Sequence, residues 1–210
     1  MKKSTRARRR PYKQAARAQA AARTGRRIID AFVEFTRDRW FDELTLNEVA
    51  SRAGVSVQSV IRRFGGKEGL ISAVMAAMGA DIGAQRATTP GDAGASITRL
   101  FEVYEEHGDG VMRNLAQEER YADLRRICDF GRREHRRLTE EVYAPWLDGL
   151  ASSERERALD ALVVATDIYV WKLLRRDMSR AVVESRNAMA RLVNAVLVEH
   201  TGKRSGEFKP

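Results

Sequence analysis

The stretch TLNEVASRAGVSVQSVIRRFGGKEGL, residues 45–70, decides the fold of this chain. It begins with the capping-box pattern Thr45-x-x-Glu48, in which the hydroxyl caps a backbone amide and the glutamate reaches back to the cap residue. Gly54 ends the helix that follows, because glycine readily takes the left-handed conformation of a helix C-terminus. Ser56 is the N-cap of a second, short helix. The spacing therefore predicts a helix-turn-helix.

The second helix is too short to be stable alone, so its inner face must pack on neighbouring helices. Val60 and Phe64 lie at the i, i+4 spacing of that inner face, and Gly65 follows as a stop. The outer face has no acidic residue, and arginine and glutamine are side chains that pair with guanine and adenine in the major groove. An ordinary solvated Arg62-Arg63 pair is the alternative. We predict that the outer face contacts DNA, and it consists of Val57, Gln58, Ser59, Ile61, Arg62 and Arg63.

Helical spacing continues on both sides of this motif. The preceding helix is expected over residues 24–39, and the alanine-rich residues 14–22 allow it to extend back towards Pro11. A fourth helix starts at Lys67. Since no segment alternates with period two over a useful length, we predict an all-α protein.

The charge of the chain is concentrated at one end. The net charge is +9, yet residues 1–27 alone hold eleven Lys or Arg and no acid, which leaves 27 basic and 29 acidic residues in the rest. We interpret residues 1–23 as a basic, largely disordered arm that lies on nucleic acid, with Arg8, Arg9 and Arg10 as its densest cluster. A mitochondrial transit peptide is the weaker alternative, because the segment has no Leu, Ile or Phe for an apolar face.

Residues 45–70 resemble the DNA-binding signature of TetR-type (tetracycline-repressor) transcriptional regulators. In that signature an alanine-glycine turn leads to a recognition helix ending in Phe, followed by a Lys-Glu-x-Leu start to the next helix. The resemblance covers about residues 24–75. It implies that Thr45 and Lys67 hold DNA phosphates and that Ser56 faces the major groove with the residues named above.

The resemblance also implies the organisation and role of the whole chain. It predicts a three-helix DNA-binding domain over residues 24–86, joined to a helical ligand-binding and dimerisation bundle over residues 87–210. The expected function is that of a cytoplasmic, homodimeric repressor, released from a palindromic operator by a small-molecule effector. Five positions depart from the family pattern. Trp40 replaces a glycine and Thr36 a core phenylalanine, and in the recognition helix Gln58 stands in place of Gly or Ala, Ile61 of Tyr and Arg63 of His. We expect Phe35, Phe41 and Trp40 to supply replacement volume in the core.

The second half of the chain is expected to form five helices, after a Thr-, Gly- and Pro-rich loop over residues 87–96. Ser153-x-x-Glu156 matches a further capping box. The predicted helices span about residues 93–107, 110–119, 121–143, 153–175 and 179–199.

The last two of these helices are the expected dimer interface, because two half-sites of a palindrome require two recognition helices. The alternative is that their apolar stripes face the core of the same chain. The first stripe is Leu159, Leu162, Val163, Thr166, Val170 and Leu173, and the second is Val182, Met189, Leu192, Val193, Val196 and Leu197.

An effector pocket is expected to use the large or soft residues of the second half. Asp167 is notable among them, since a carboxylate within ALVVATDIYVWKLL must be paired, hydrated or bound to ligand if it is buried. The predicted ligand-binding residues are Tyr104, Met112, Cys128, Tyr143, Trp146, Asp167 and Trp171.

Other function classes find no support in the sequence. Cys128 and His135 are two helical turns apart, too far to share a metal, and no nucleophile, phosphate loop, cofactor motif or membrane span is visible. We therefore predict no enzyme, no metal and no cofactor. The remaining alternatives are a sequence-tolerant architectural binder of nucleic acid and a regulator that binds no effector.

Overall fold

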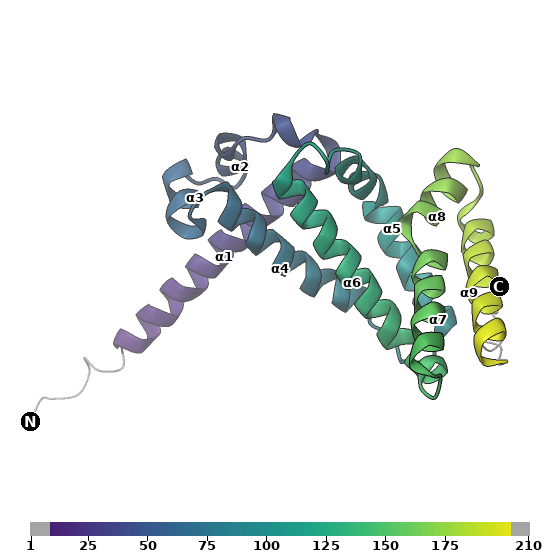
Figure 1. The fold of residues 1–210 in the computed structure, drawn as a ribbon. Helices are drawn as coiled ribbons and strands as arrows, with labels where there is room; N and C mark the ends of the chain where they lie inside the picture. The colour runs from purple at the N-terminus through teal and green to yellow at the C-terminus, as the bar shows by residue number, and fades with distance from the viewer. Residues whose placement is uncertain (1–8, 203–210) are drawn as a thin grey trace, which may run out of the picture. The chain divides into compact units, whose positions relative to one another are not determined.

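The computed structural model describes residues 9–202, and the regular elements in this range are all helical, without a strand (Figure 1). The all-α prediction is confirmed. No helix within these residues is long and apolar enough to span a lipid bilayer. The elements are α1 (Arg9–Asp38), the 3-10 turn η1 (Phe41–Glu43), α2 (Leu46–Arg52), α3 (Val57–Phe64), α4 (Lys67–Gln85), α5 (Ala93–Leu115), α6 (Ala122–Leu147), α7 (Ser152–Ala165), α8 (Ile168–Lys172), the π-helical segment η2 (Leu173–Asp177) and α9 (Val182–Thr201).

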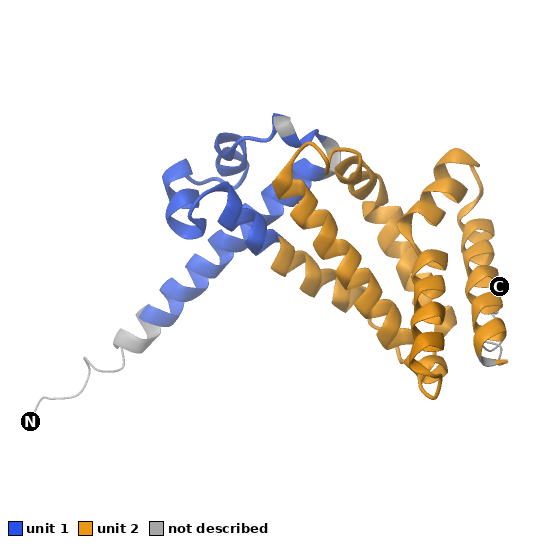
Figure 2. Cartoon of the chain, in the orientation of Figure 1, with its two compact units in different colours: residues 1–74 blue, residues 75–210 orange. Residues whose placement is uncertain are grey.

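Two compact units divide the chain within α4, residues 1–74 and residues 75–210 (Figure 2). The first unit contains the helix-turn-helix and the second contains the helical bundle. α4 belongs to both units, because its first residues follow α3 directly and its last residues precede the bundle helices. One continuous helix therefore connects the two units along the chain.

The basic arm is not largely disordered as predicted, because α1 begins at Arg9 rather than near Thr24. Residues 14–22 are rich in alanine, the best helix former, and Pro11 falls within the first turn, where its missing N–H is not needed. All side chains of residues 14–23 are exposed. This half of α1 is thus a helix that buries none of its described side chains.

The first unit has a small core to which every helix contributes. Ile28 and Phe32 of α1 are almost fully buried, as are Val49, Val60 and Leu70 of the three following helices. Of the three residues expected to fill core volume here, Phe41 is buried and Phe35 is partly buried. Trp40, the third, is instead 50% exposed at the start of η1.

The predicted helix signals of the motif are all in place. Thr45 caps α2 with the complete capping box, since its hydroxyl accepts from the Glu48 amide and the Glu48 carboxylate accepts from the Thr45 amide. Ser56 caps α3 by accepting from the Ser59 amide. Gly54, between the helices, has a φ of +65°, a conformation that side chains with a Cβ rarely adopt.

α5 is one long helix where two were predicted. The predicted break falls between residues 107 and 110, but Gly108 and Gly110 are both buried inside α5. A Cβ at Gly108 would lie 2.4 Å from Cη2 of Trp171, so the glycine is needed for packing rather than for a turn. The close approach lets the indole of Trp171 lie fully buried against α5.

The predicted helix over residues 153–175 is instead broken at Thr166 and Asp167. Asp167 has an extended backbone and caps α8, because its carboxylate accepts from the Tyr169 amide at 2.9 Å. The predicted capping box at Ser153 is wrong, since α7 begins one residue earlier with Ala151 as N-cap and no side-chain cap. Glu184 supplies half of such a cap at the start of α9 by accepting from the Ala181 amide.

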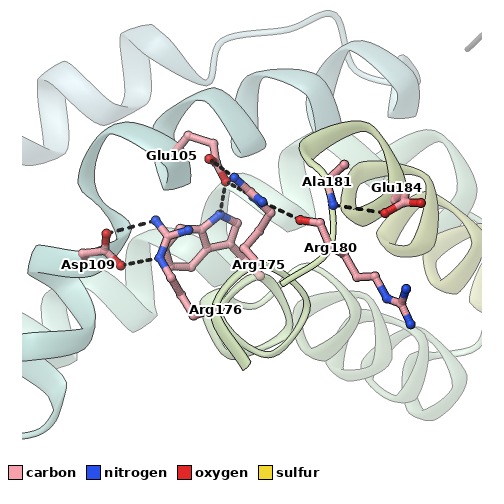
Figure 3. Close-up of polar contacts among 8 residues, drawn as sticks. Glu105, Asp109, Arg175, Arg176, Arg180, Ala181 and Glu184 are labelled. Atoms are coloured by element: carbon pink, nitrogen blue, oxygen red, sulfur yellow. Dashed lines mark hydrogen bonds and ion pairs between the residues drawn. The ribbon is translucent and has the colours of Figure 1, made fainter. Parts of the chain in front are cut away.

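Bidentate ion pairs fix the π-helical segment η2 to α5 (Figure 3). Both Nε and Nη2 of Arg175 donate to the Glu105 carboxylate, at 2.8 and 2.9 Å, and the Trp171 indole donates to the same carboxylate at 2.7 Å. Arg176 forms an equivalent pair with Asp109 and stacks over the Trp171 ring at 4.5 Å. These contacts hold the pKa values of both carboxyl groups below their usual range.

Candidate nucleic-acid interface

The outer face of α3 is open to solvent and carries only positive charge. Gln58, Ile61, Arg62 and Arg63 are exposed, while Val60 anchors the opposite face in the core. Ile61 is 47% exposed, which is unusual for a large apolar side chain on a small unit. No acidic residue occurs between Glu48 and Glu68, so the whole turn and helix present a basic surface.

Serine hydroxyls organise the first turn of this face. The Ser56 and Ser59 hydroxyl oxygens are 3.0 Å apart, and Nη2 of Arg62 lies 3.5 Å from the Ser59 hydroxyl. That last distance is too long for a strong hydrogen bond, so the Arg62 guanidinium keeps its donors for another partner. The free N-terminal amides of α3 add a partial positive charge at the same end.

Arg63 takes a different position from its neighbour Arg62. Its guanidinium lies against Gly25 of α1, where an added Cβ would be 2.5 Å from the Arg63 Nε. The Arg63 side chain is exposed, but it follows α1 instead of extending the face that Gln58 and Arg62 share. Arg62 is therefore the best-placed arginine of α3 for reading base edges.

Thr45 and Lys67, the predicted phosphate contacts, both make contacts within the unit. The Thr45 hydroxyl is engaged in the cap with Glu48, and Nη1 of Arg39 donates to Glu48 at 2.7 Å. The Arg39 hydrogen bond, followed by those from Thr45, lowers the pKa of Glu48 to about 2. The Lys67 ammonium lies 4.0 Å from the centre of the Phe41 ring, a cation–π distance.

The predicted arm residues lie only partly within the described structure. Arg8 falls outside the described residues, and the side chains of Arg9 and Arg10 at the start of α1 do so as well. Arg17 and Arg23, farther along the exposed part of α1, are solvent-accessible. The exposed half of α1 thus adds positive charge on a helix.

None of the seven predicted ligand residues lines the groove of the second unit described below. Tyr104 and Trp171 pack together with ring centroids 6.1 Å apart, and Tyr143 and Trp146 form a second pair at 5.8 Å. Trp171 and Tyr143 are core residues of the second unit, and Met112 packs against that core.

Asp167 and Cys128 also have structural explanations. Asp167 is the N-cap of α8, as described above. Cys128 is a buried thiol of α6, and burial raises its pKa to about 12. Neither residue lines the groove of the second unit described next.

Sequence reasoning missed a groove between the end of α4 and the C-terminal half of α6. Its volume is about 690 Å³, and Arg86, 8% exposed, and Thr88 contribute its polar groups at the inner end. Arg86 directly follows the last residue of α4. Arginine is common at the C-terminus of a helix, so the sequence does not mark this one as a site residue. The apolar walls are formed by Ala87, Pro90, Leu138, Val142, Ala144 and Pro145.

The predicted dimer stripes belong mainly to the core of their own chain. Leu159, Leu162, Met189 and Val193 are almost completely buried within the second unit. The segment from α7 to α9 also holds eight of the ten exposed large apolar residues found in the described chain, and three of them, Leu173, Val182 and Leu192, belong to the predicted stripes. These eight residues, called the α7–α9 face below, are Val164, Tyr169, Leu173, Met178, Val182, Val183, Leu192 and Val198.

Histidine, cysteine and carboxylate side chains of residues 9–202 form no group of three or more with the arrangement of a metal site. His200 contacts Glu154, which joins the end of α9 to the start of α7. The polar clusters described so far are therefore explained by capping and ion pairing.

Comparison with known proteins agrees with this geometry. Residues 28–74 match the family described as bacterial regulatory proteins, tetR family. No curated protein matches the chain.

Solved structures share its fold at low sequence identity. A tetR-family transcriptional regulator from Streptomyces coelicolor is 19% identical with a TM-score of 0.61, over 82% of this chain and 81% of that one. A transcriptional regulator from Rhodococcus sp. Rha1 is 17% identical with a TM-score of 0.63, over 83% and 96%. A TetR transcriptional regulator from Rhodococcus sp. RHA1 is 20% identical with a TM-score of 0.55, over 86% and 98%.

Proposed function

We propose that the chain is a DNA-binding transcriptional regulator of the tetR family and that it acts as a homodimeric repressor, which a small-molecule effector releases from a palindromic operator. The observation that carries this proposal is the exposed, acid-free face of α3 on a capped helix-turn-helix. Such a helix enters the major groove with its side chains against base edges.

Affinity and sequence specificity come from different parts of the proposed interface. The exposed half of α1 and the residues before it supply charge, which neutralises phosphates without reading the sequence. Gln58 and Arg62 supply donors and acceptors that distinguish base pairs, with Ile61 as an apolar contact for a thymine methyl group. Thr45 and Lys67 support this docking by holding phosphates, and Ser56 faces the major groove beside Gln58 and Arg62.

Effector release requires a link between the bundle and α3. α4 provides that link along the chain, because it starts two residues after α3 ends and finishes beside the groove at Arg86. An effector that binds better to the state unable to bind DNA shifts the population towards that state. Operator affinity then falls by the ratio of the two effector affinities.

The proposal is tested by selecting duplexes from a random pool with the full chain and measuring affinity for selected and random DNA. Arg62→Ala is expected to reduce discrimination between the two by about 1–3 kcal/mol, because it removes a base contact. Removal of residues 1–23 is expected to weaken binding to both duplexes and to flatten the salt dependence, while the preference for selected DNA remains.

Arg99→Ala is the matched control, since it removes an exposed arginine from the second unit, where Arg99 pairs with Glu102 on its own helix. It is expected to leave both affinities unchanged. Selection without any enriched sequence, or a steep loss of all binding on arm removal, contradicts the proposal and favours the sequence-tolerant binder.

A further inference from the structure

Arg86 is a buried cation that lacks a counter-charge. Its residue is 8% exposed, and Nη1 donates to Nδ1 of His135 at 3.2 Å. Within the described residues 9–202 this is the one hydrogen bond that the guanidinium makes, and no carboxylate lies within ion-pair distance of it. A buried arginine is normally paired with an anion, because an unpaired charge in a poorly solvated site is unfavourable.

The partner of Arg86 is a neutral histidine and does not balance the charge. Nδ1 of His135 accepts from Arg86, so the ring proton belongs on Nε2, which lies 3.2 Å from the Val163 carbonyl oxygen and 3.3 Å from the Thr166 hydroxyl. Burial, and then the charge of Arg86, keeps the pKa of His135 well below its usual range. His135 thus orients the guanidinium without neutralising it.

Other polar atoms near Arg86 also lack partners. The Thr88 hydroxyl lies in the same groove, is buried, and has no hydrogen bond. The Tyr143 hydroxyl is buried without a hydrogen bond, and it is close enough for the charge of Arg86 to influence its pKa. The groove is therefore lined by an unpaired guanidinium and an unpaired hydroxyl, and a second unpaired hydroxyl lies near the guanidinium.

At the exposed rim of the groove, unlike at Arg86, the positive charge is paired with carboxylates. Arg137 pairs there with Glu134 and with Glu141, and Asp148 adds a further negative charge. The walls between rim and inner end are mostly apolar, formed by leucine, valine, proline and alanine side chains. A ligand with one negative charge and an apolar body matches this division, whereas a dianion would leave excess negative charge beside Glu141.

We propose that the groove binds an apolar monocarboxylate, with the carboxylate on the Arg86 guanidinium and the Thr88 hydroxyl and the hydrocarbon body along Leu138, Val142 and Pro145. The planar guanidinium presents parallel donors that fit a carboxylate. The volume of about 690 Å³ is within the range of small-molecule sites. Identifying this ligand as the effector rests on the proposed function, whereas the binding site itself does not.

The site is tested by calorimetry on the full chain with octanoate and phenylacetate, each against its uncharged primary amide. Both carboxylates are expected to bind at least about tenfold more tightly than their amides, because only they supply the missing charge. Equal affinity of acid and amide, or no carboxylate binding up to about 5 mM, overturns the proposal. This comparison needs no variant. Octyl phosphate serves as the dianionic probe, and tighter binding of it than of octanoate overturns the assignment to a carboxylate.

Variants then locate the binding. Arg86→Met is expected to remove the tenfold preference for acid over amide. Thr88→Val deletes only the hydroxyl function, and it is expected to weaken octanoate binding severalfold. Arg99→Met applies the same substitution outside the groove, and it is expected to keep wild-type affinity.

Circular dichroism checks that Arg86→Met is folded. If it is not, Arg86→Lys, which keeps the charge but loses the fork of donors, is expected to weaken octanoate binding while leaving octanamide binding unchanged. Wild-type octanoate affinity in the folded Arg86 variant and in Thr88→Val overturns the site.

Fluorescence anisotropy of labelled, selected DNA separates this inference from the proposed function. Carboxylates that bind at Arg86 without weakening DNA binding contradict effector release but support the site. Release by the amides, with no effect of the acids, supports effector release and overturns the site.

Discussion

At Gly108 the α5 backbone comes so close to the Trp171 indole that no side chain fits between them. Gly108→Ala places a methyl group 2.4 Å from Cη2 of Trp171. Trp171 is fully buried, and its indole N–H is bound to Glu105, so the ring has little freedom to move. We expect Gly108→Ala to lower the free energy of unfolding by about 1–3 kcal/mol in urea denaturation, as overpacking does.

Gly131→Ala is the control for this prediction. Gly131 lies on the exposed face of α6, where an added Cβ meets no atom within 4 Å. Alanine there is expected to raise stability by up to about 1 kcal/mol, because a helical glycine is less favourable than alanine. Equal stability of the two variants would show that Trp171 moves aside.

Single residues also show what the sequence predicts reliably. Thr45 and Ser56 were identified as caps, because a cap depends on residues within three positions of itself. Asp167 was interpreted as a candidate ligand contact although it is a cap, since its apolar neighbours concealed the end of α7. The unpaired state of Arg86 depends on His135, 49 positions away, so no local pattern reveals it.

At the junction of α8 and η2, an ion pair attaches the chain to α5. Glu105 accepts from both Arg175 and Trp171, and it is the point at which η2 is attached to α5 (Figure 3). Glu105→Gln keeps an acceptor for the indole but loses the charged, bidentate pair. We expect a loss of about 1 kcal/mol in unfolding free energy at neutral pH.

The pH dependence of this loss follows from the lowered pKa of Glu105. A carboxyl group with a lowered pKa in the folded state stabilises the fold above its unfolded pKa, and the contribution disappears as the pH falls through the folded value. The difference between wild type and Glu105→Gln is therefore expected to be constant above about pH 5 and to shrink below it. Glu102→Gln, on the same helix with an exposed i, i+3 partner, is the control and is expected to change little. A difference that persists at low pH would contradict the ion-pair explanation.

Helix existence was predictable here, but helix ends in the second unit were not. The spacing of apolar residues indicates helices throughout, yet it does not show that Gly108 is buried inside α5 or that the chain bends at Thr166. The burial of Gly108 results from packing against Trp171, which is about sixty positions away. Long-range contacts of this kind override local propensity.

For the whole molecule, the main question is what covers the α7–α9 face. Large apolar residues exposed on a folded unit mark a contact surface, and a second copy is the partner that the proposed palindromic operator requires. The predicted interface stripes combine core residues with exposed ones, because apolar spacing does not distinguish a residue facing its own core from one facing a partner. Exposure makes that distinction: it retains Leu192, at 47%, and adds Val164, at 66%, which neither stripe contained.

Leu192→Lys tests this interface, because it places a charge within the α7–α9 face without touching the core. We expect its dimer to be at least about tenfold weaker than that of the wild type, measured by light scattering across a dilution series. Val164→Lys is expected to act in the same way from α7. Trp40→Lys is the matched control, since Trp40 is 50% exposed but lies in the first unit. Affinity for a selected palindrome should fall with the dimer, because two linked recognition helices bind more tightly than one. Wild-type dimerisation in both α7–α9 variants would place the interface elsewhere.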